Sequence, residues 1–215
     1  MRILILFNPV AGAGKGAAAA RRIRTWLWRA GYETVEAETR EDPPDDLLAG
    51  AGAVVVVGGD GALRQAADAA IRTGTPIYHF PCGTVNLFAR ELGMDRRRQT
   101  LLRALERRQP QQVDAGVANG RLFLLMASLG YDAEVVHDLA GHRGASISHG
   151  SYLLPMARRL RAWQPPRLEI TVDGLPLEKG GTGGSRVYVI VANCRRYMWR
   201  LNPAGRAVKS TRGPR

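Results

Sequence analysis

Ala53-Val54-Val55-Val56-Val57-Gly58-Gly59-Asp60-Gly61-Ala62 sets four consecutive valines before a loop of three glycines and one carboxylate. An unbroken apolar run of this kind is typical of a strand that is buried on both faces, as inside a parallel sheet. The alanine-rich residues 63–71 follow and predict a helix. The loop therefore lies between the carboxyl end of a strand and the N-terminus of a helix, where amide dipoles favour phosphate.

Asp60 is the chemically informative residue of this loop. A carboxylate repels phosphate, so a plain anion receptor is a poor interpretation of the loop. An acid at this position is suited to carrying a metal ion or to accepting a proton from an attacking hydroxyl group. The alternative is structural: an ordinary glycine-rich turn in which Asp60 is the N-cap of its own helix.

The composition of the 215-residue chain, 45% hydrophobic and 23% charged, is typical of a soluble globular protein. No apolar run reaches the roughly 18 residues that a membrane span needs. Cys82 and Cys194 suggest neither a disulfide framework nor a metal cluster, which favours a reduced, cytoplasmic setting. The net charge of +12 is concentrated in residues 195–215. No nucleic-acid-binding motif accompanies it, so no nucleic-acid partner is expected.

The first half of the chain alternates between the two kinds of secondary structure. Strands are predicted at residues 2–7, 33–39, 53–57 and 76–80, and helices at 15–30, 43–49, 63–71, 86–92 and 95–108. This order predicts an α/β fold with an N-terminal domain built on a doubly wound parallel sheet. We assign residues 1–110 to that domain.

The pattern changes after residue 110. Strands are predicted at residues 113–117, 121–127, 167–173 and 186–193, with a helix at 148–163. Asn119-Gly120 and Asp173-Gly174 are the turns expected between antiparallel strands. Residues 111–194 therefore predict an antiparallel β-rich domain, and the basic residues 195–215 predict a disordered tail.

Glycine-bearing turns follow three of the predicted strands. They are Asn8-Pro9-Val10-Ala11-Gly12-Ala13-Gly14, Gly58-Gly59-Asp60-Gly61 and Pro81-Cys82-Gly83-Thr84-Val85-Asn86. In a parallel sheet the carboxyl ends of the strands meet at one edge, where ligands bind. We therefore expect the three turns to converge on one site.

The three turns, with the Ala-Arg pair that follows the last, resemble those of the diacylglycerol kinase catalytic domain family. This family includes bacterial lipid kinases and sphingosine kinases, and is distantly related to NAD kinases and 6-phosphofructokinases. The resemblance extends over residues 1–195 and is closest over residues 1–92. It implies a kinase that transfers the γ-phosphoryl group of ATP, with Mg²⁺, to the hydroxyl group of diacylglycerol or a related lipid.

The resemblance also implies roles for particular residues. Asp60 becomes the catalytic carboxylate, and no separate set of metal ligands is implied. The nucleotide would be bound by Asn8, Pro9, Gly12, Thr39, Gly58, Gly59, Gly61, Ala62, Arg64, Thr84 and Asn86. Thr39 has an equally plain interpretation as a residue that ends a strand.

The sequence departs from the family at several places. Ala62 and Gln65 replace a threonine and a glutamate that usually follow Gly-Gly-Asp-Gly, and Leu87 replaces a frequent acid. In the family, further strands complete a β-sandwich where this chain has its basic tail. The resemblance therefore implies that residues 111–194 form an incomplete antiparallel β-sandwich domain that binds the lipid. These departures leave two alternatives: a truncated nucleotide-binding fragment without activity, and an NAD-kinase-like enzyme. The tail itself could instead bind anionic lipid.

The implied partners follow from the lipid substrate. We expect transient contact with a membrane surface by a cytoplasmic protein that is peripheral at the inner membrane. Strand edges left open in an incomplete second domain would favour a homodimer.

Overall fold

The computed structural model describes residues 1–40, 43–130, 133, 171–176 and 189–194. Its contacts divide the chain into two units. The first contains Met1–Met126 and the chain from Ala192 onward, and the second contains Ala127–Val191. The first unit thus continues past residue 110 and includes the first two strands of the predicted β-rich region.

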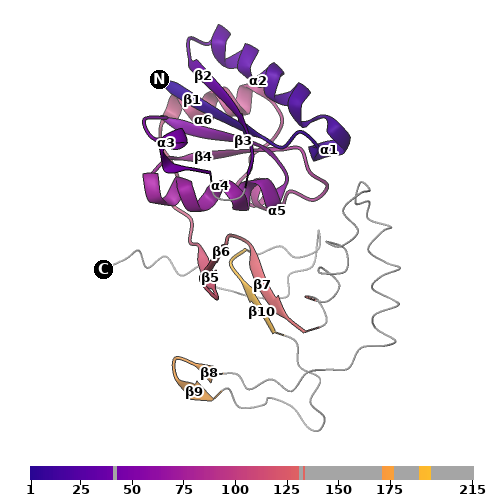
Figure 1. Ribbon diagram of the computed structural model, residues 1–215, viewed down its shortest axis with the longest axis vertical. Coiled ribbons are helices and arrows are strands. Elements are labelled where there is room, and N and C mark those ends of the chain that lie inside the picture. Colours follow the sequence, from indigo (N-terminus) through magenta and orange to yellow (C-terminus); the bar gives the residue numbers. More distant parts are fainter. Residues whose placement is uncertain (41–42, 131–132, 134–170, 177–188, 195–215) are drawn as a thin grey trace. The chain divides into compact units, whose positions relative to one another are not determined.

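Four parallel strands form the sheet of the first unit (Figure 1). They are β1 (Arg2–Phe7), β2 (Glu33–Glu38), β3 (Ala53–Gly58) and β4 (Ile77–Pro81), in the order β2-β1-β3-β4. All three neighbouring pairs are parallel, which confirms the doubly wound α/β prediction. The order of the strands changes direction at β1: the chain goes first to β2 on one side of β1, and then to β3 and β4 on the other side. Doubly wound sheets bind their ligands at this switch point, between β1 and β3.

The helices lie close to the predicted ranges. They are α2 (Gly16–Arg29), α3 (Asp45–Leu48), α4 (Asp60–Thr73), α5 (Leu87–Glu91) and α6 (Arg98–Arg107). The segment α1 (Ala11–Gly14) is an irregular turn, because Gly12 and Ala13 have φ of +60° and +57°. Helix α4 begins three residues before the predicted range, at Asp60 itself.

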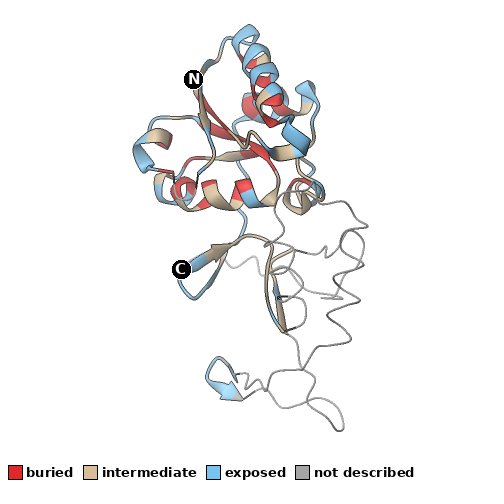
Figure 2. Cartoon of the chain, turned by 45° about the vertical axis from the view of Figure 1, so that its right-hand side comes forward, coloured by how far each residue is buried: buried red, intermediate tan, exposed pale blue. Residues whose placement is uncertain are grey.

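The helices cover both faces of the sheet, so the unit has three layers (Figure 2). Alternate residues of each strand belong to different cores, as the pleat of a strand requires. Ile3, Ile5, Val55 and Val57 pack with α2 and α6. Leu4, Leu6, Val54 and Val56 pack with α3 and α4. Burial on both faces is the reason that β3 consists of consecutive valines.

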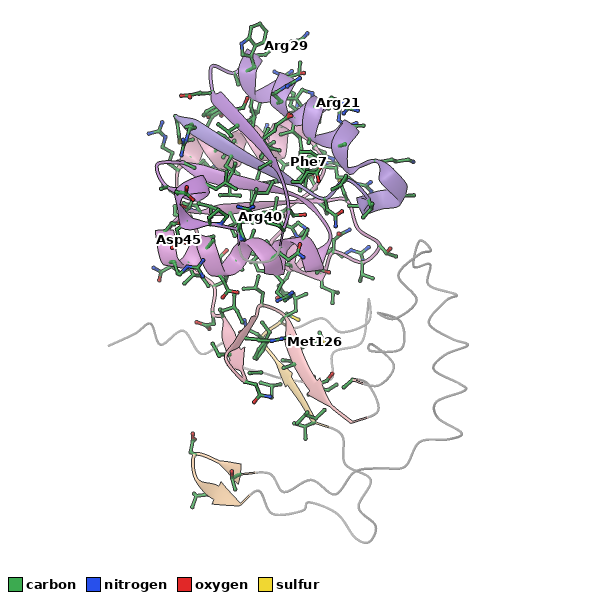
Figure 3. The ribbon with its side chains drawn as sticks, viewed as in Figure 1. Phe7, Arg21, Arg29, Arg40, Asp45 and Met126 are labelled. Atoms are coloured by element: carbon green, nitrogen blue, oxygen red, sulfur yellow. The ribbon has the colours of Figure 1, made fainter. Side chains whose placement is uncertain are left out.

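Surface contacts also connect the helices. Asp45 of α3, labelled in Figure 3, accepts a hydrogen bond from Nε of Arg72 on α4, with a distance of 2.9 Å to Oδ1. Both side chains are about half exposed, so the pair adds little stability. Within the part of the chain that the structure describes, no helix has the length and apolarity to cross a bilayer.

The second half contains short strands. They are β5 (Gly116–Ala118), β6 (Arg121–Phe123), β7 (Met126–Leu129), β8 (Thr171–Val172), β9 (Leu175–Pro176) and β10 (Val189–Ala192). The pairs β5–β6 and β8–β9 are antiparallel hairpins. Their turns have positive φ at both central residues, Asn119-Gly120 and Asp173-Gly174, as predicted.

Two strand predictions need correction. The strand predicted to begin at residue 113 begins at Gly116. The strand predicted for residues 121–127 is interrupted between β6 and β7, where Leu124 packs against the core on the α4 side of the sheet. The predicted helix at residues 148–163, the strand portion at 167–170 and the tail at 195–215 lie outside the described residues.

The burial of two residues on α2 predicts different effects of substitution on stability. Ile23 is 0% exposed and Trp28 is 72% exposed. We expect Ile23→Ala to lower the free energy of unfolding by about 2–5 kcal/mol, because it removes buried methyl groups and leaves a cavity. Trp28→Ala should change it by no more than about 0.5 kcal/mol. Urea unfolding of both variants checks this, and equal losses would contradict the assigned burial.

Candidate nucleotide site at the carboxyl edge of the sheet

The three glycine turns contact one another through their backbones. A β-carbon on Gly83 would lie 2.7 Å from the α-carbon of Gly59. A β-carbon on Gly12 would lie 2.6 Å from the carbonyl oxygen of Cys82, and Gly12 has a φ of +60°. Glycine is therefore required at these places by close approach, and at Gly12 by conformation as well. The predicted convergence of the three turns is confirmed.

The first turn is held against β3. The amide of Asn8 donates to the carbonyl oxygen of Val57 at 3.0 Å, which continues the pairing of β1 with β3. The side-chain Oδ1 of Asn8 accepts from the amide of Val10 at 3.1 Å. Asn8 thus forms a side-chain turn that fixes the path toward Pro9 and Gly12. Gly12 itself is exposed at the edge.

The second turn presents the N-terminus of α4. Its first backbone bond runs from the amide of Leu63 to the carbonyl oxygen of Gly59, at 3.2 Å. The amides of Asp60, Gly61 and Ala62 therefore precede the first bond within the helix. Such amides, with the positive end of the helix dipole, are suited to an anion such as phosphate.

Ala62 differs from the other predicted nucleotide contacts in its burial. It is 4% exposed and packs in the core with Leu4 and Leu6. A β-carbon on Gly58 would lie 2.6 Å from that of Ala62. Only the backbone of Ala62 is therefore available to a ligand at the edge. The space left in the core limits which side chain can stand at position 62.

Asp60 connects the second turn to the third. Its carboxylate accepts hydrogen bonds from the amides of Leu87 at 2.9 Å and Phe88 at 3.2 Å. These amides begin α5, so Asp60 caps a helix distant in sequence. The alternative in which Asp60 caps its own helix is wrong, because α4 has no side-chain cap bond. The carboxylate charge is stabilised by the N-termini of two helices, α4 and α5.

The third turn is closed by its own asparagine. Oδ1 of Asn86 accepts from the amide of Gly83 at 2.9 Å, and Nδ2 donates to the Gly83 carbonyl oxygen at 2.6 Å. Asn86 has a φ of +52°, a conformation that asparagine tolerates better than most residues. Thr84 is exposed within the same turn. Asn86 thus shapes the wall on which Thr84 is presented.

Thr39 and Arg64 complete the predicted set. The amide of Thr39 donates to the carbonyl oxygen of Phe7 at 2.9 Å, one residue before Asn8. Arg64, the fifth residue of α4, is half-buried. All the predicted site residues therefore lie at or after the carboxyl ends of β1, β2, β3 and β4, on one edge of one sheet.

Sequence reasoning missed the contribution of His79. This residue of β4 is 0% exposed, and its Nε2 lies 3.1 Å from the carbonyl oxygen of Gly58, where the second turn begins. Burial lowers the pKa of His79, and the Gly58 carbonyl and Asp60 oppose that shift only in part. A histidine within an otherwise apolar strand, two residues before the third turn, was the available signal.

The other titratable side chains near the third turn are unsuited to chemistry. Burial raises the pKa of the Cys82 thiol, and Arg96 and Arg22 offset this only in part, so the thiol stays neutral. Burial raises the pKa of Tyr78 to about 12, and its hydroxyl donates to the Asp95 carbonyl oxygen at 3.1 Å. Both side chains pack against or within the core beside α2 and α6.

The donor set at the edge suits a metal ion that arrives with a substrate. Among the described residues, no group of three or more histidine, cysteine, aspartate or glutamate side chains is placed to hold a metal. Asp60 is the single carboxylate among the predicted site residues. Mg²⁺ is commonly bound by phosphate oxygens with one or two carboxylates, and Asp60 with a nucleotide meets that requirement.

Fold and site together define an α/β protein in which three glycine turns meet around one aspartate at the carboxyl edge of a parallel sheet. Residues 2–118 match the diacylglycerol kinase catalytic domain. Because this match covers more than half of the chain, the protein belongs to the diacylglycerol kinase catalytic domain family. The resemblance inferred from the motifs is confirmed.

Relatives in Pseudomonas agree with this assignment. The chain is 31% identical over 160 residues to a probable lipid kinase YegS-like of Pseudomonas aeruginosa, covering 71% of this chain and 51% of that protein. It is 32% identical over 130 residues to a protein of the same description from Pseudomonas putida, covering 60% and 44%. The chain thus spans about half the length of these relatives.

Solved structures support the fold. A putative diacylglycerol kinase from Bacillus anthracis is similar with a TM-score of 0.63 and 23% sequence identity. The similarity covers 91% of this chain and 67% of that one. At this level of identity the likeness concerns the fold, which confirms the predicted fold class.

Two glycines of the site predict opposite responses to alanine. A β-carbon on Gly83 would be 2.7 Å from the Gly59 α-carbon, whereas one on Gly61 meets nothing within 4 Å. We expect Gly83→Ala to lower the free energy of unfolding by about 1–3 kcal/mol through overpacking. Gly61→Ala, within α4, should leave it unchanged or raise it by up to about 1 kcal/mol. Chemical denaturation distinguishes the two, and equal stability of both variants would contradict the contact between the turns.

His79 predicts a dependence of stability on pH. Its pKa in the folded protein is below the ordinary 6.5, so the unfolded chain binds this proton more readily. The contribution of neutral His79 is complete above pH 6.5 and is lost as the pH falls through the lower folded-state value. Unfolding followed from pH 8 to pH 5 should show a smaller decrease in the free energy of unfolding in His79→Gln, which has no imidazole to protonate. Parallel profiles of the variant and the wild type would refute the assignment.

Proposed function

We propose that this chain forms the nucleotide-binding part of an ATP-dependent lipid kinase, which phosphorylates the hydroxyl group of diacylglycerol or a related lipid. The observation that carries the proposal is the position of Asp60, which lies between the N-termini of α4 and α5 and has its carboxylate held by two amides. Membership of the diacylglycerol kinase catalytic domain family supports the same chemistry.

The phosphates of ATP would occupy the sheet edge beside α4. The amides of Asp60, Gly61 and Ala62 provide donors there, and the glycines of the turns allow phosphate oxygens to approach the backbone closely. Asn8 and Thr39 border the site on the β1 and β2 side, and Thr84 borders it on the β4 side. Mg²⁺, bound by phosphate oxygens and Asp60, would neutralise charge on the transferred group.

Asp60 would act on the lipid hydroxyl group. The hydroxyl oxygen attacks the γ-phosphorus, the bond from that phosphorus to the β-phosphate oxygen breaks, and the hydroxyl proton passes to the Asp60 carboxylate. The amides of Leu87 and Phe88 hold this carboxylate in one orientation, at 2.9 and 3.2 Å. A base held in this way loses little entropy when the substrate arrives.

We further propose transient contact with an anionic membrane, in the cytoplasm and at the inner membrane surface. An arginine-rich cavity of about 730 Å³ supports this. It is lined by Arg22, Trp26, Arg96, Arg97, Arg98, Gln99 and Leu102. Arg22 lies over the Trp26 ring, 5.0 Å from its centre. Arginines beside an aromatic ring are suited to lipid phosphates at an interface. The homodimer stays a prediction.

The activity is tested by incubating the protein with [γ-³²P]ATP, Mg²⁺ and phosphatidylglycerol vesicles that carry diacylglycerol or other lipid alcohols, with NAD as a soluble acceptor. We expect radioactive lipid that depends on Mg²⁺ and disappears with EDTA. Label in NAD alone would favour the NAD-kinase-like alternative. Stabilisation of the fold by ATP without transfer to any acceptor would leave a nucleotide-binding protein without activity.

Asp60→Asn isolates the role of the carboxylate. Asparagine retains one acceptor for the α5 amides but is a far weaker base, so we expect kcat to fall by at least about 100-fold. ATP should still raise the melting temperature of the variant. Asp68→Asn, on the same helix, is the matched control and should retain its kcat. Unimpaired transfer by Asp60→Asn would refute this role.

A further inference from the structure

His79 occupies a position from which it contacts both sides of the site. In β4 it pairs with Val56 of β3, and its ring centre lies 6.3 Å from that of Phe88 on α5. Its backbone amide lies 3.2 Å from the sulfur of Met94. The ring is 0% exposed, so its polar atoms can be satisfied only by the protein around them.

The carbonyl oxygen of Gly58 accepts two hydrogen bonds. One comes from the amide of Cys82 at 2.7 Å, which connects the second turn to the third. The other comes from Nε2 of His79 at 3.1 Å. Gly58 is the last residue of β3 and precedes Asp60 by two positions. Fixing this carbonyl therefore fixes the peptide that leads to the carboxylate.

The tautomer of His79 follows from its surroundings. A carbonyl oxygen only accepts, so Nε2 must carry the proton, and burial keeps the imidazole neutral. Nδ1 is then an acceptor, and it is buried with no hydrogen-bond partner within the described residues. An unpaired buried acceptor has a free-energy cost that a leucine here would avoid. Stability alone therefore does not favour a histidine at this position.

We propose that His79 is a positioning residue for phosphoryl transfer, which acts on Asp60 from two sides. Its Nε2–H holds the Gly58 carbonyl at the start of the turn that carries Asp60. Its ring lies beside Phe88, the amide of which holds the Asp60 carboxylate. The expected effect on kcat rests on the proposed kinase function, whereas the expected effect on the position of Asp60 rests on the geometry alone.

Two substitutions separate the donor from the bulk of the side chain. His79→Leu removes the donor to Gly58, whereas His79→Gln retains a side-chain N–H. Because small displacements of a catalytic group have large effects on rate, we expect His79→Leu to lower kcat by about 10- to 100-fold. The KM for ATP should change by less than the kcat, since Asp60 acts on the lipid hydroxyl. His79→Gln should recover most of the lost kcat.

A purely structural role would give a different result. The fraction folded is measured for each variant at the assay temperature, and kcat is expressed per folded molecule. If His79→Leu then matches the wild type, or if His79→Gln is as slow as His79→Leu, the positioning role is overturned. If His79→Leu does not fold, the comparison of His79→Gln with the wild type decides, and a 10-fold loss there overturns the proposal.

A second measurement does not depend on kinase activity. ¹⁵N NMR of labelled protein at pH 7 should show His79 neutral with the proton on Nε2, and the opposite tautomer or a charged ring would overturn the proposal. In His79→Leu the amide resonances of Leu87 and Phe88 should shift relative to the wild type. If no lipid is phosphorylated, the proposed function fails, but these shifts still test whether His79 positions Asp60. Unchanged amide resonances of Leu87 and Phe88 would overturn that positioning role.

Discussion

The absence of side chains at three glycines is the constraint on which the site depends. Gly12, Gly59 and Gly83 allow three turns to approach through their backbones at the carboxyl edge of the sheet. The approach concentrates amide groups and one helix N-terminus around a small volume, an environment that favours phosphate. The sheet supplies the rigidity, because β1 and β3 are buried on both faces and pair in a single register.

Asp60 links these turns electrostatically. A negative charge at the site proposed for phosphate would normally be unfavourable, and the structure offsets it with the amides that begin α5. The same bonds connect β3 and its helix to the turn after β4. A group suited to proton transfer is therefore also a structural connection, so changes at Asp60 affect both the chemistry and the local fold.

The sequence predicted the sheet and the converging turns because both follow from short-range patterns, as in the valines of β3 and the glycines after each strand. It could not predict that Asp60 caps a helix 27 residues away, because a contact between distant elements leaves no periodic signal. The burial of Ala62 depends on the packing of α4 and was likewise hidden. The contribution of His79 was missed because its partner is a backbone carbonyl, which no side-chain motif reports.

The way in which Asp60 is held has a consequence for divergence within the family. Its two donors are main-chain amides, so the bonds do not depend on which side chains stand at positions 87 and 88; among the standard residues only proline lacks the amide. Leu87 can therefore replace a frequent acid without loss of this support. A position that supports the site through its backbone alone can change its side chain and keep that support.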